Sequence, residues 1–135
     1  MISEADQIAE LLRTSKTIAV VGLTSDPMRP SNSVSAYMQS QGYRIIPVNP
    51  NEREVLGEKA YARLADVPVK IDLVNVFRRP EFVADIVHQA IELKLLAIWL
   101  QEGVVDDRAA QSARDAGMIV VMDRCILKEH SRRRF

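Results

Sequence analysis

A polar loop, residues 22–31, is the first segment whose residue types suit chemistry. Gly22 ends an apolar run, and hydroxyl side chains follow it at Thr24, Ser25 and Ser31. A helix is expected to begin near Ser31, and the free N–H groups and positive dipole end of a helix start favour an anion. Arg29 adds a permanently charged guanidinium that can bind an oxyanion at two points. The loop therefore fits a phosphate cradle, although an ordinary strand-to-helix turn with a serine cap has the same composition.

Two adjacent arginines form a second polar segment, Phe77-Arg78-Arg79-Pro80, after another apolar run. Proline is favoured at the first position of a helix, so the two guanidinium groups are expected beside a helix start. That position favours contact with an anion or a nucleotide over plain solvated charge. The three arginines at 132–134, by contrast, are interpreted as a solvated tail.

Side chains suited to catalysis are few. His88 is expected to face solvent, because it lies opposite the apolar face of its predicted helix, and His130 lies in the tail. Two histidines without a cluster of Cys, Asp or Glu make no metal motif. Cys125 is interpreted as a small buried hydrophobe, although Arg124 beside it can lower a thiol pKa and so favour a reactive role. We therefore predict no catalytic residue and no metal ligand.

Two common nucleotide motifs are missing from the chain. The dinucleotide fingerprint G-x-G-x-x-G keeps only Gly22, and Thr24 stands where the second glycine belongs. That fingerprint also uses an Asp or Glu at the end of the second strand to bind the ribose hydroxyls, and Pro47-Val48-Asn49-Pro50 offers no carboxylate. No Gly-Lys-Ser or Gly-Lys-Thr occurs either. NAD and ATP hydrolysis of the P-loop kind are therefore disfavoured.

Five short apolar runs must position these loops. They lie at 17–22, 43–48, 71–76, 96–100 and 118–122. Continuous runs rich in β-branched residues suit strands that are buried on both faces, as in a parallel sheet. Because helix-like segments separate them, we predict a doubly wound α/β fold with a five-stranded parallel sheet. The candidate loops follow the carboxyl ends of these strands, which is where open parallel sheets bind ligands.

Capping residues mark the helices between the runs. Residues suited to a helix start are Ser3, Ser31 or Ser33, Pro80 and Asp106. The first helix is expected to extend to Arg13. Gly117 is suited to ending the helix that begins near Asp106. The stretch 49–68 is less regular and is predicted to hold a short helix around 61–65.

Length and composition indicate one domain. The chain has 135 residues, 47% of them hydrophobic, which suffices for a single core. Its 18 basic and 18 acidic residues argue against a nucleic-acid partner, which normally meets a basic excess. One cysteine fits a reducing compartment, and no apolar run approaches the roughly 18 residues of a membrane span. We expect one cytoplasmic domain over residues 1–135 that binds a small molecule and has no nucleic-acid or membrane partner.

Five ordered motifs stand at the predicted strand ends. They are Gly22…Asp26-Pro27…Arg29-Pro30-Ser31, Pro47-Val48-Asn49-Pro50, Val76-Phe77-Arg78-Arg79-Pro80-Glu81, Trp99-Leu100-Gln101-Glu102-Gly103-Val104 and Val120-Val121-Met122-Asp123-Arg124-Cys125. Together they resemble the small stand-alone CoA-binding proteins, which are similar to the N-terminal Rossmann-like domain of the succinyl-CoA synthetase α-subunit. The resemblance covers about residues 5–130. It implies a three-layer αβα sandwich with strand order 3-2-1-4-5 that binds coenzyme A across the first strand ends.

The resemblance also implies roles for particular segments. Residues 22–31 would meet the phosphates, and residues 47–49 would line the adenine or ribose side, where a carboxylate would repel the 3′-phosphate that CoA carries and NAD lacks. The same cleft would be bordered by Phe77, Arg78 and Pro80, and residues 101–103 would approach the pantetheine arm. The binding residues so implied are Gly22, Thr24, Ser25, Arg29, Ser31, Pro47, Val48, Asn49, Phe77, Arg78, Pro80, Gln101, Glu102 and Gly103.

Two departures limit what the resemblance implies. The synthetase's first loop is richer in glycine and supplies a lysine, whereas Arg29 is the basic candidate here. The synthetase's phosphorylated histidine belongs to a second domain, so no ligase activity is implied for residues 1–135. We expect a protein that binds coenzyme A or an acyl-CoA without an evident catalytic apparatus. The alternatives are an enzyme acting on the CoA thiol or thioester through Cys125 or Glu102, an NAD(P)-binding domain, and a site for another small phosphate compound.

Overall fold

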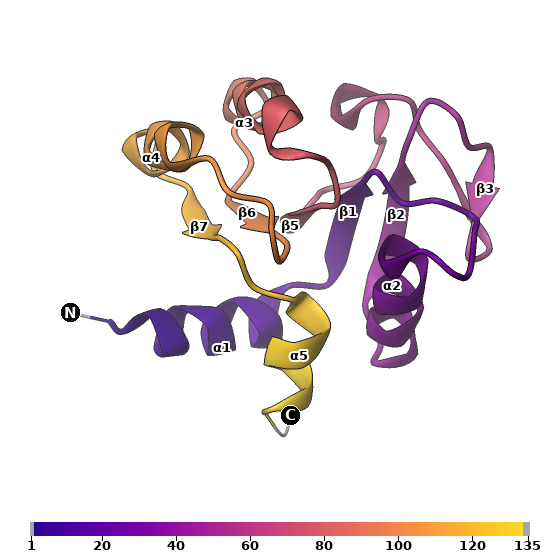
Figure 1. Cartoon of the computed structure of the whole chain (residues 1–135), viewed down its shortest axis with the longest axis horizontal. Helices are drawn as coiled ribbons and strands as arrows, with labels where there is room; N and C mark the ends of the chain where they lie inside the picture. Colours follow the sequence, from indigo (N-terminus) through magenta and orange to yellow (C-terminus); the bar gives the residue numbers. More distant parts are fainter. Residues whose placement is uncertain (1, 134–135) are drawn as a thin grey trace.

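The computed structural model describes residues 2–133 and contains the five predicted strands in one sheet (Figure 1). In chain order the elements are α1 (Glu4–Thr14), β1 (Thr17–Val21), α2 (Pro30–Ser40), β2 (Arg44–Val48), β3 (Glu54–Val55), β4 (Glu58–Lys59), the 3-10 turn η1 (Leu64–Asp66), β5 (Leu73–Val76), the 3-10 turn η2 (Pro80–Phe82), α3 (Val83–Glu92), β6 (Ala97–Leu100), α4 (Asp107–Asp115), β7 (Ile119–Val121) and α5 (Ile126–Ser131).

The strand order is β2-β1-β5-β6-β7, and all neighbouring pairs are parallel. Tyr61 forms an isolated parallel bridge with Val48 and so occupies the position outside β2. With that bridge counted as the third strand, the order is 3-2-1-4-5-6, so the 3-2-1-4-5 style arrangement is confirmed, with its outermost strand reduced to one bridge and with β7 added at the other edge. The segment at Leu73–Val76 pairs with β1 and is the fourth strand of that arrangement. The small antiparallel pair of β3 and β4 was not predicted.

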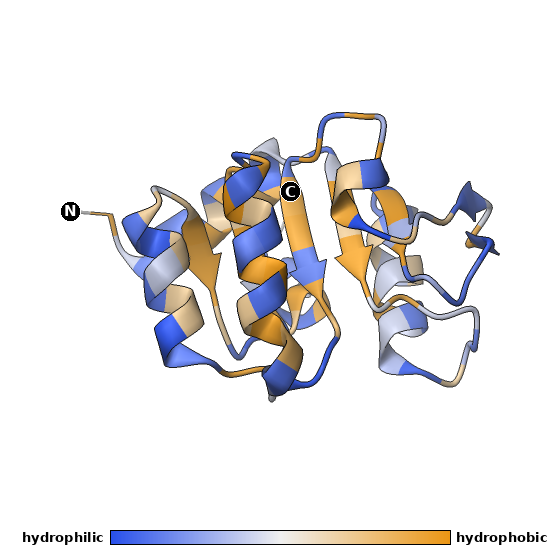
Figure 2. Cartoon of the chain, turned by 90° about the horizontal axis from the view of Figure 1, so that it is seen from above, coloured by the Kyte–Doolittle hydropathy of each residue, from blue (hydrophilic) through white to orange (hydrophobic). Residues whose placement is uncertain are grey.

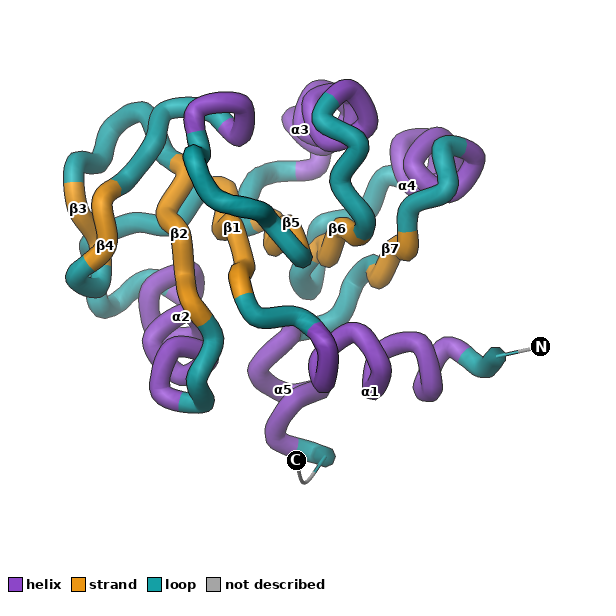
Figure 3. The backbone as a smooth tube through the Cα atoms, turned by 180° about the vertical axis from the view of Figure 1, so that it is seen from behind, coloured by secondary structure: helices purple, strands orange, loops and turns teal. Residues whose placement is uncertain are grey.

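Helices cover both faces of the sheet, as expected for a doubly wound fold (Figures 1 and 3). On one face, α3 and α4 pack with β-strand residues such as Val74 and Ile98 into an apolar cluster. On the other face, α1, α2 and α5 pack with Ile18 and Trp99 into a second cluster. Figure 2 shows the apolar strands between helices that carry hydrophilic residues. Strands buried on both faces explain the unbroken apolar runs of the sequence.

Most helix boundaries follow the capping chemistry, with one correction. The Ser3 hydroxyl accepts from the Asp6 amide at 3.1 Å, and Asp106 Oδ1 accepts from the Ala109 amide at 3.0 Å. The expectation that Ser31 or Ser33 caps the second helix is wrong, because α2 begins at Pro30 and Arg29 is its N-cap. Proline has no N–H to satisfy and its φ is already helical, so it starts the helix without a side-chain cap.

The solvated tail expected for the arginines at 132–134 is correct for Arg132, whose side chain is 63% exposed, and wrong for Arg133, whose side chain is 22% exposed. The chain forms α5, and Glu129 within it is only 5% exposed. Arg132 and Arg133 bind the Glu129 carboxylate, with N–O distances of 2.7 and 3.1 Å. His130 is 7% exposed, and its Nδ1 lies 2.9 Å from the Tyr37 hydroxyl. The run of charged residues did not indicate that one face of α5 is buried. Arg134 lies outside the described residues.

Burial lowers the pKa of His130, and this predicts a pH dependence of stability. The unfolded chain, with an ordinary histidine pKa near 6.5, binds the proton more readily than the folded protein. Stability from this group is therefore complete above about pH 6.5 and is lost as pH falls below it. We expect the Tm to fall between about pH 7.5 and pH 5, and His130→Gln to flatten the decline. His88→Gln is the control, because that side chain is 69% exposed, as predicted; an equal flattening there would contradict the account.

No helix in residues 2–133 has both the length and the apolar character that crossing a membrane requires.

Candidate functional site

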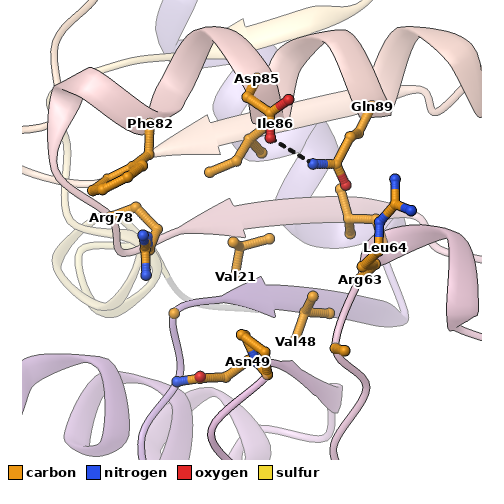
Figure 4. Close-up of a pocket in the computed structure, with 13 residues that line it drawn as sticks. Val21, Val48, Asn49, Arg63, Leu64, Arg78, Phe82, Asp85, Ile86 and Gln89 are labelled. Atoms are coloured by element: carbon orange, nitrogen blue, oxygen red, sulfur yellow. Dashed lines mark hydrogen bonds between the residues drawn. The ribbon is translucent and has the colours of Figure 1, made fainter.

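A cavity of about 200 Å³ lies at the carboxyl ends of β1 and β2, between these strands, η1 and the start of α3 (Figure 4). Apolar side chains of β1, β2, η1 and α3 form much of its surface, and polar or charged side chains border it. Its lining residues are Val21, Gly22, Val48, Asn49, Pro50, Ala62, Arg63, Leu64, Arg78, Phe82, Asp85, Ile86 and Gln89. Of the 14 residues predicted for the site, it brings together Gly22, Val48, Asn49 and Arg78.

Gly22 allows two loops to meet at the cavity. Its amide donates to the Val48 carbonyl at 2.9 Å, which continues the pairing of β1 with β2. Its φ is +91°, and a Cβ at this position would lie 2.3 Å from the carbonyl oxygen of Phe77. Only glycine tolerates both the backbone conformation and the close approach. The loop after β1 therefore lies directly against the loop after β5.

Arg78 lies beside the cavity with its guanidinium over an aromatic ring. Its Cζ is 4.1 Å from the centre of the Phe82 ring, within the range of a cation–π contact. Arg63 lines another side of the cavity, as Figure 4 shows. Arg79 instead pairs with Glu81 at 3.3 Å on the exposed surface and does not line the cavity. The cavity thus has two guanidinium groups on its border, together with the carboxylate of Asp85.

Asn49 fixes the turn that follows β2. Its side-chain amide donates to the Leu23 carbonyl at 3.1 Å, and its Oδ1 accepts from the Asn51 amide at 2.9 Å. Pro47, one strand position before Val48, accepts at its carbonyl from the Tyr61 amide. Asn49 is 8% exposed, and its side-chain hydrogen bonds hold the loops after β1 and β2 together.

The first loop lies next to this turn but does not line the cavity beyond Gly22. The Thr24 amide donates to the Ser31 hydroxyl at 3.2 Å, so Ser31 closes the loop from inside α2. The Ser25 amide donates to the carboxylate of Glu52 at 2.7 Å. Arg29 is exposed at the start of α2.

The remaining predicted residues do not line the cavity. Phe77 packs against the cluster under α1, α2 and α5, and Pro80 is exposed as the first residue of η2. Gln101 Oε1 accepts from the Ile126 amide, Glu102 pairs with Lys128 at 2.9 Å, and the Gly103 amide donates to Asp123 Oδ1. Residues 101–103 therefore connect the loop after β6 to the loop after β7 and to α5.

Several residues of the site were missed in the sequence analysis. Phe82, Asp85 and Gln89 are spaced i, i+3 and i+7, which places them on one helix face, so helical periodicity contained a signal for them. Arg63 and Glu52 belong to the irregular stretch after β2, and no periodicity marks them. The segment 47–50 has no carboxylate, but the carboxylate of Glu52, in the residues that follow, binds the first loop.

Cys125 is 8% exposed and packs in the apolar cluster with Ile126 and Trp99, away from the cavity. Within residues 2–133, no group of three or more His, Cys, Asp and Glu side chains is placed to hold a metal ion.

Comparison with known proteins identifies the family of this chain. Residues 16–131 match the model of the CoA binding domain. The chain belongs to the CoA binding domain family. The match spans all five strands of the main sheet and every loop at their carboxyl ends.

Three known proteins are similar to this chain. The uncharacterized protein YneT of Bacillus subtilis (strain 168) is 44% identical over 125 residues, which is 93% of each chain. The solved structure of a hypothetical protein from Pyrococcus horikoshii OT3 has a TM-score of 0.92 and 38% identity, covering 96% of this chain and 92% of that one. The acetate–CoA ligase (ADP-forming) II subunit alpha of Pyrococcus furiosus is 36% identical over 67 residues, 49% of this chain but 15% of that protein. The domain therefore resembles both small proteins and part of a larger ligase subunit.

Proposed function

We propose that this CoA binding domain binds coenzyme A or an acyl-CoA at the carboxyl edge of its sheet and has no catalytic apparatus of its own. The observation that carries the proposal is the cavity between the loops after β1, β2 and β5, in a chain of this family. Its volume of about 200 Å³ is smaller than a pocket for a drug-sized molecule, roughly 300–1,000 Å³. The cavity is thus large enough for one end of CoA, and the remainder of the molecule would lie along the carboxyl edge of the sheet.

Charge and surface chemistry favour the nucleotide end of CoA in the cavity. Val21, Val48 and Ile86 offer apolar surface to an adenine ring, and Arg63 and Arg78 offer guanidinium groups to phosphate oxygens. Arg29 lies on the first loop, from which it would bind the pyrophosphate. Residues 101–103 lie further along the same sheet edge, in the direction the pantetheine arm would take.

Selectivity among nucleotides tests the proposal. CoA carries a 3′-phosphate that dephospho-CoA and NAD lack, so we expect CoA to raise the Tm more than dephospho-CoA, and both more than NAD. A ligand at 100 times its Kd adds about 2.7 kcal/mol to the free energy of unfolding, which gives a clear shift. Thermal melts with each ligand at equal concentration measure it. A shift with NAD as large as with CoA would contradict the proposal.

Cys125→Ser tests the alternative in which the thiol takes part in chemistry. Because the thiol is buried in the apolar cluster, we expect the serine variant to bind CoA within about threefold of the parent. Calorimetric titration of both proteins measures the ratio. A mixed disulfide between CoA and Cys125, detected in the intact protein by mass spectrometry, would instead support the thiol-active enzyme.

A further inference from the structure

A carboxylate of the chain itself occupies part of the loop proposed to bind phosphate. Glu52 Oε2 accepts a hydrogen bond from the Ser25 amide at 2.7 Å, between the segment after β2 and the loop after β1. The two residues are 27 positions apart, so the contact depends on the fold. A backbone N–H that binds a carboxylate oxygen offers the same chemistry to a phosphate oxygen.

The turn at Asn49 holds Glu52 in this position. The Glu52 amide donates to the Asn49 carbonyl at 3.2 Å, and Asn49 Oδ1 accepts from the Asn51 amide at 2.9 Å. Asn49 is also bonded to the Leu23 carbonyl of the first loop. The backbone and the side chain of the same buried residue, Asn49, therefore hold the segments on both sides of the contact between Glu52 and Ser25.

Among residues 2–133, no lysine or arginine forms an ion pair with Glu52, whose hydrogen-bonded partner is the Ser25 amide. A second loop amide, that of Met28, donates to Asp26 Oδ1 at 2.9 Å. The carboxylates of Glu52 and Asp26 thus place negative charge at the first loop, where the proposed ligand brings more, and like charges at close range repel.

We propose that Glu52 sets the selectivity of the site by occupying the Ser25 amide until a ligand displaces it. This inference rests on the proposed function. An anion that contacts only the first loop must compete with the Glu52 carboxylate for the Ser25 amide and therefore binds weakly. A ligand with several phosphates also reaches Arg63 and Arg78, and those contacts offset the displacement. The segment after β2 then moves when the ligand binds.

Glu52→Gln tests the inference, because glutamine keeps the size of the side chain and removes its charge. We expect CoA to bind this variant about 5- to 10-fold tighter than the parent, and Glu52→Ala at least as tightly, since a charge-assisted bond no longer has to break. The tenfold limit corresponds to about 1.4 kcal/mol. Glu54→Gln is the matched control, because Glu54 is an exposed residue of the same segment with the same charge. Its CoA affinity should stay within about twofold.

Calorimetric titration with CoA gives the affinities, and the amide resonance of Ser25 gives a second reading. That resonance should shift in the Glu52 variants without ligand, and in the parent when CoA is added. The inference is overturned if the parent binds CoA and Glu52→Gln binds it equally or more weakly, or if Glu54→Gln tightens binding as much. Absence of CoA binding to the parent would overturn the proposed function, and this inference with it.

Discussion

Gly22→Ala is expected to lower the free energy of unfolding by about 2–5 kcal/mol. Two penalties add at this position. The φ of +91° costs any residue with a Cβ, and the added Cβ would lie 2.3 Å from the Phe77 carbonyl oxygen. That oxygen belongs to the backbone at the end of a central strand, so it cannot move without disturbing the pairing of β1 with β5. Urea unfolding of the variant and the parent measures the loss.

Gly42→Ala separates the two penalties. Gly42 has a φ of +99°, and a Cβ there would meet no atom within 4 Å. Its substitution should therefore cost only the conformational part, about 1–2 kcal/mol. Equal losses for the two alanine variants would show that the contact of the loops after β1 and β5 does not restrict position 22.

Arg29→Ala is expected to weaken CoA binding by about 10- to 150-fold. A charge-assisted bond contributes about 1.5–3 kcal/mol, and 1.4 kcal/mol is a factor of ten in Kd. The Tm of the ligand-free protein should hardly change, because Arg29 is exposed at the start of α2. Arg29→Lys should restore only part of the affinity, since lysine keeps the charge but not the planar fork. Calorimetric titration with CoA measures each variant.

Two further variants show where the phosphates lie. Arg114→Ala is the control, because Arg114 lies in the last turn of α4, at the opposite edge of the sheet, and should bind CoA like the parent. Arg78→Ala removes a guanidinium from the cavity border. If Arg29→Ala binds CoA like the parent while Arg78→Ala loses affinity, the first loop is not the phosphate site and the cavity border is.

The strands and most helices could be predicted because strands that are buried on both faces have continuous apolar sequences. Five apolar runs gave the strands, and Ser3, Asp106 and Gly117 gave helix boundaries through capping chemistry alone. The end of the chain was harder, since α5 has few apolar residues and its stability depends on contacts such as His130 with Tyr37. Contacts between residues that are far apart in the sequence leave no pattern in the residues around them.

The candidate site was only partly predictable for a similar reason. Gly22 and Arg78 stand directly at strand ends, where chain position alone places them at the ligand edge. Arg63 and Glu52 reach that edge from the irregular stretch after β2, whose path depends on the Asn49 turn and the Tyr61 bridge. Gln101, expected in the site, has its side-chain oxygen committed to the Ile126 amide, a partner 25 residues away.

Calorimetric titration of the unaltered protein with CoA, followed by the same titration with NAD, tests the central claim most directly. We expect saturable binding of one CoA per chain and at least tenfold weaker binding of NAD, because Arg63 and Arg78 at the cavity border are available to the 3′-phosphate that NAD lacks. No saturable heat with CoA, or equal affinities for CoA and NAD, would contradict it.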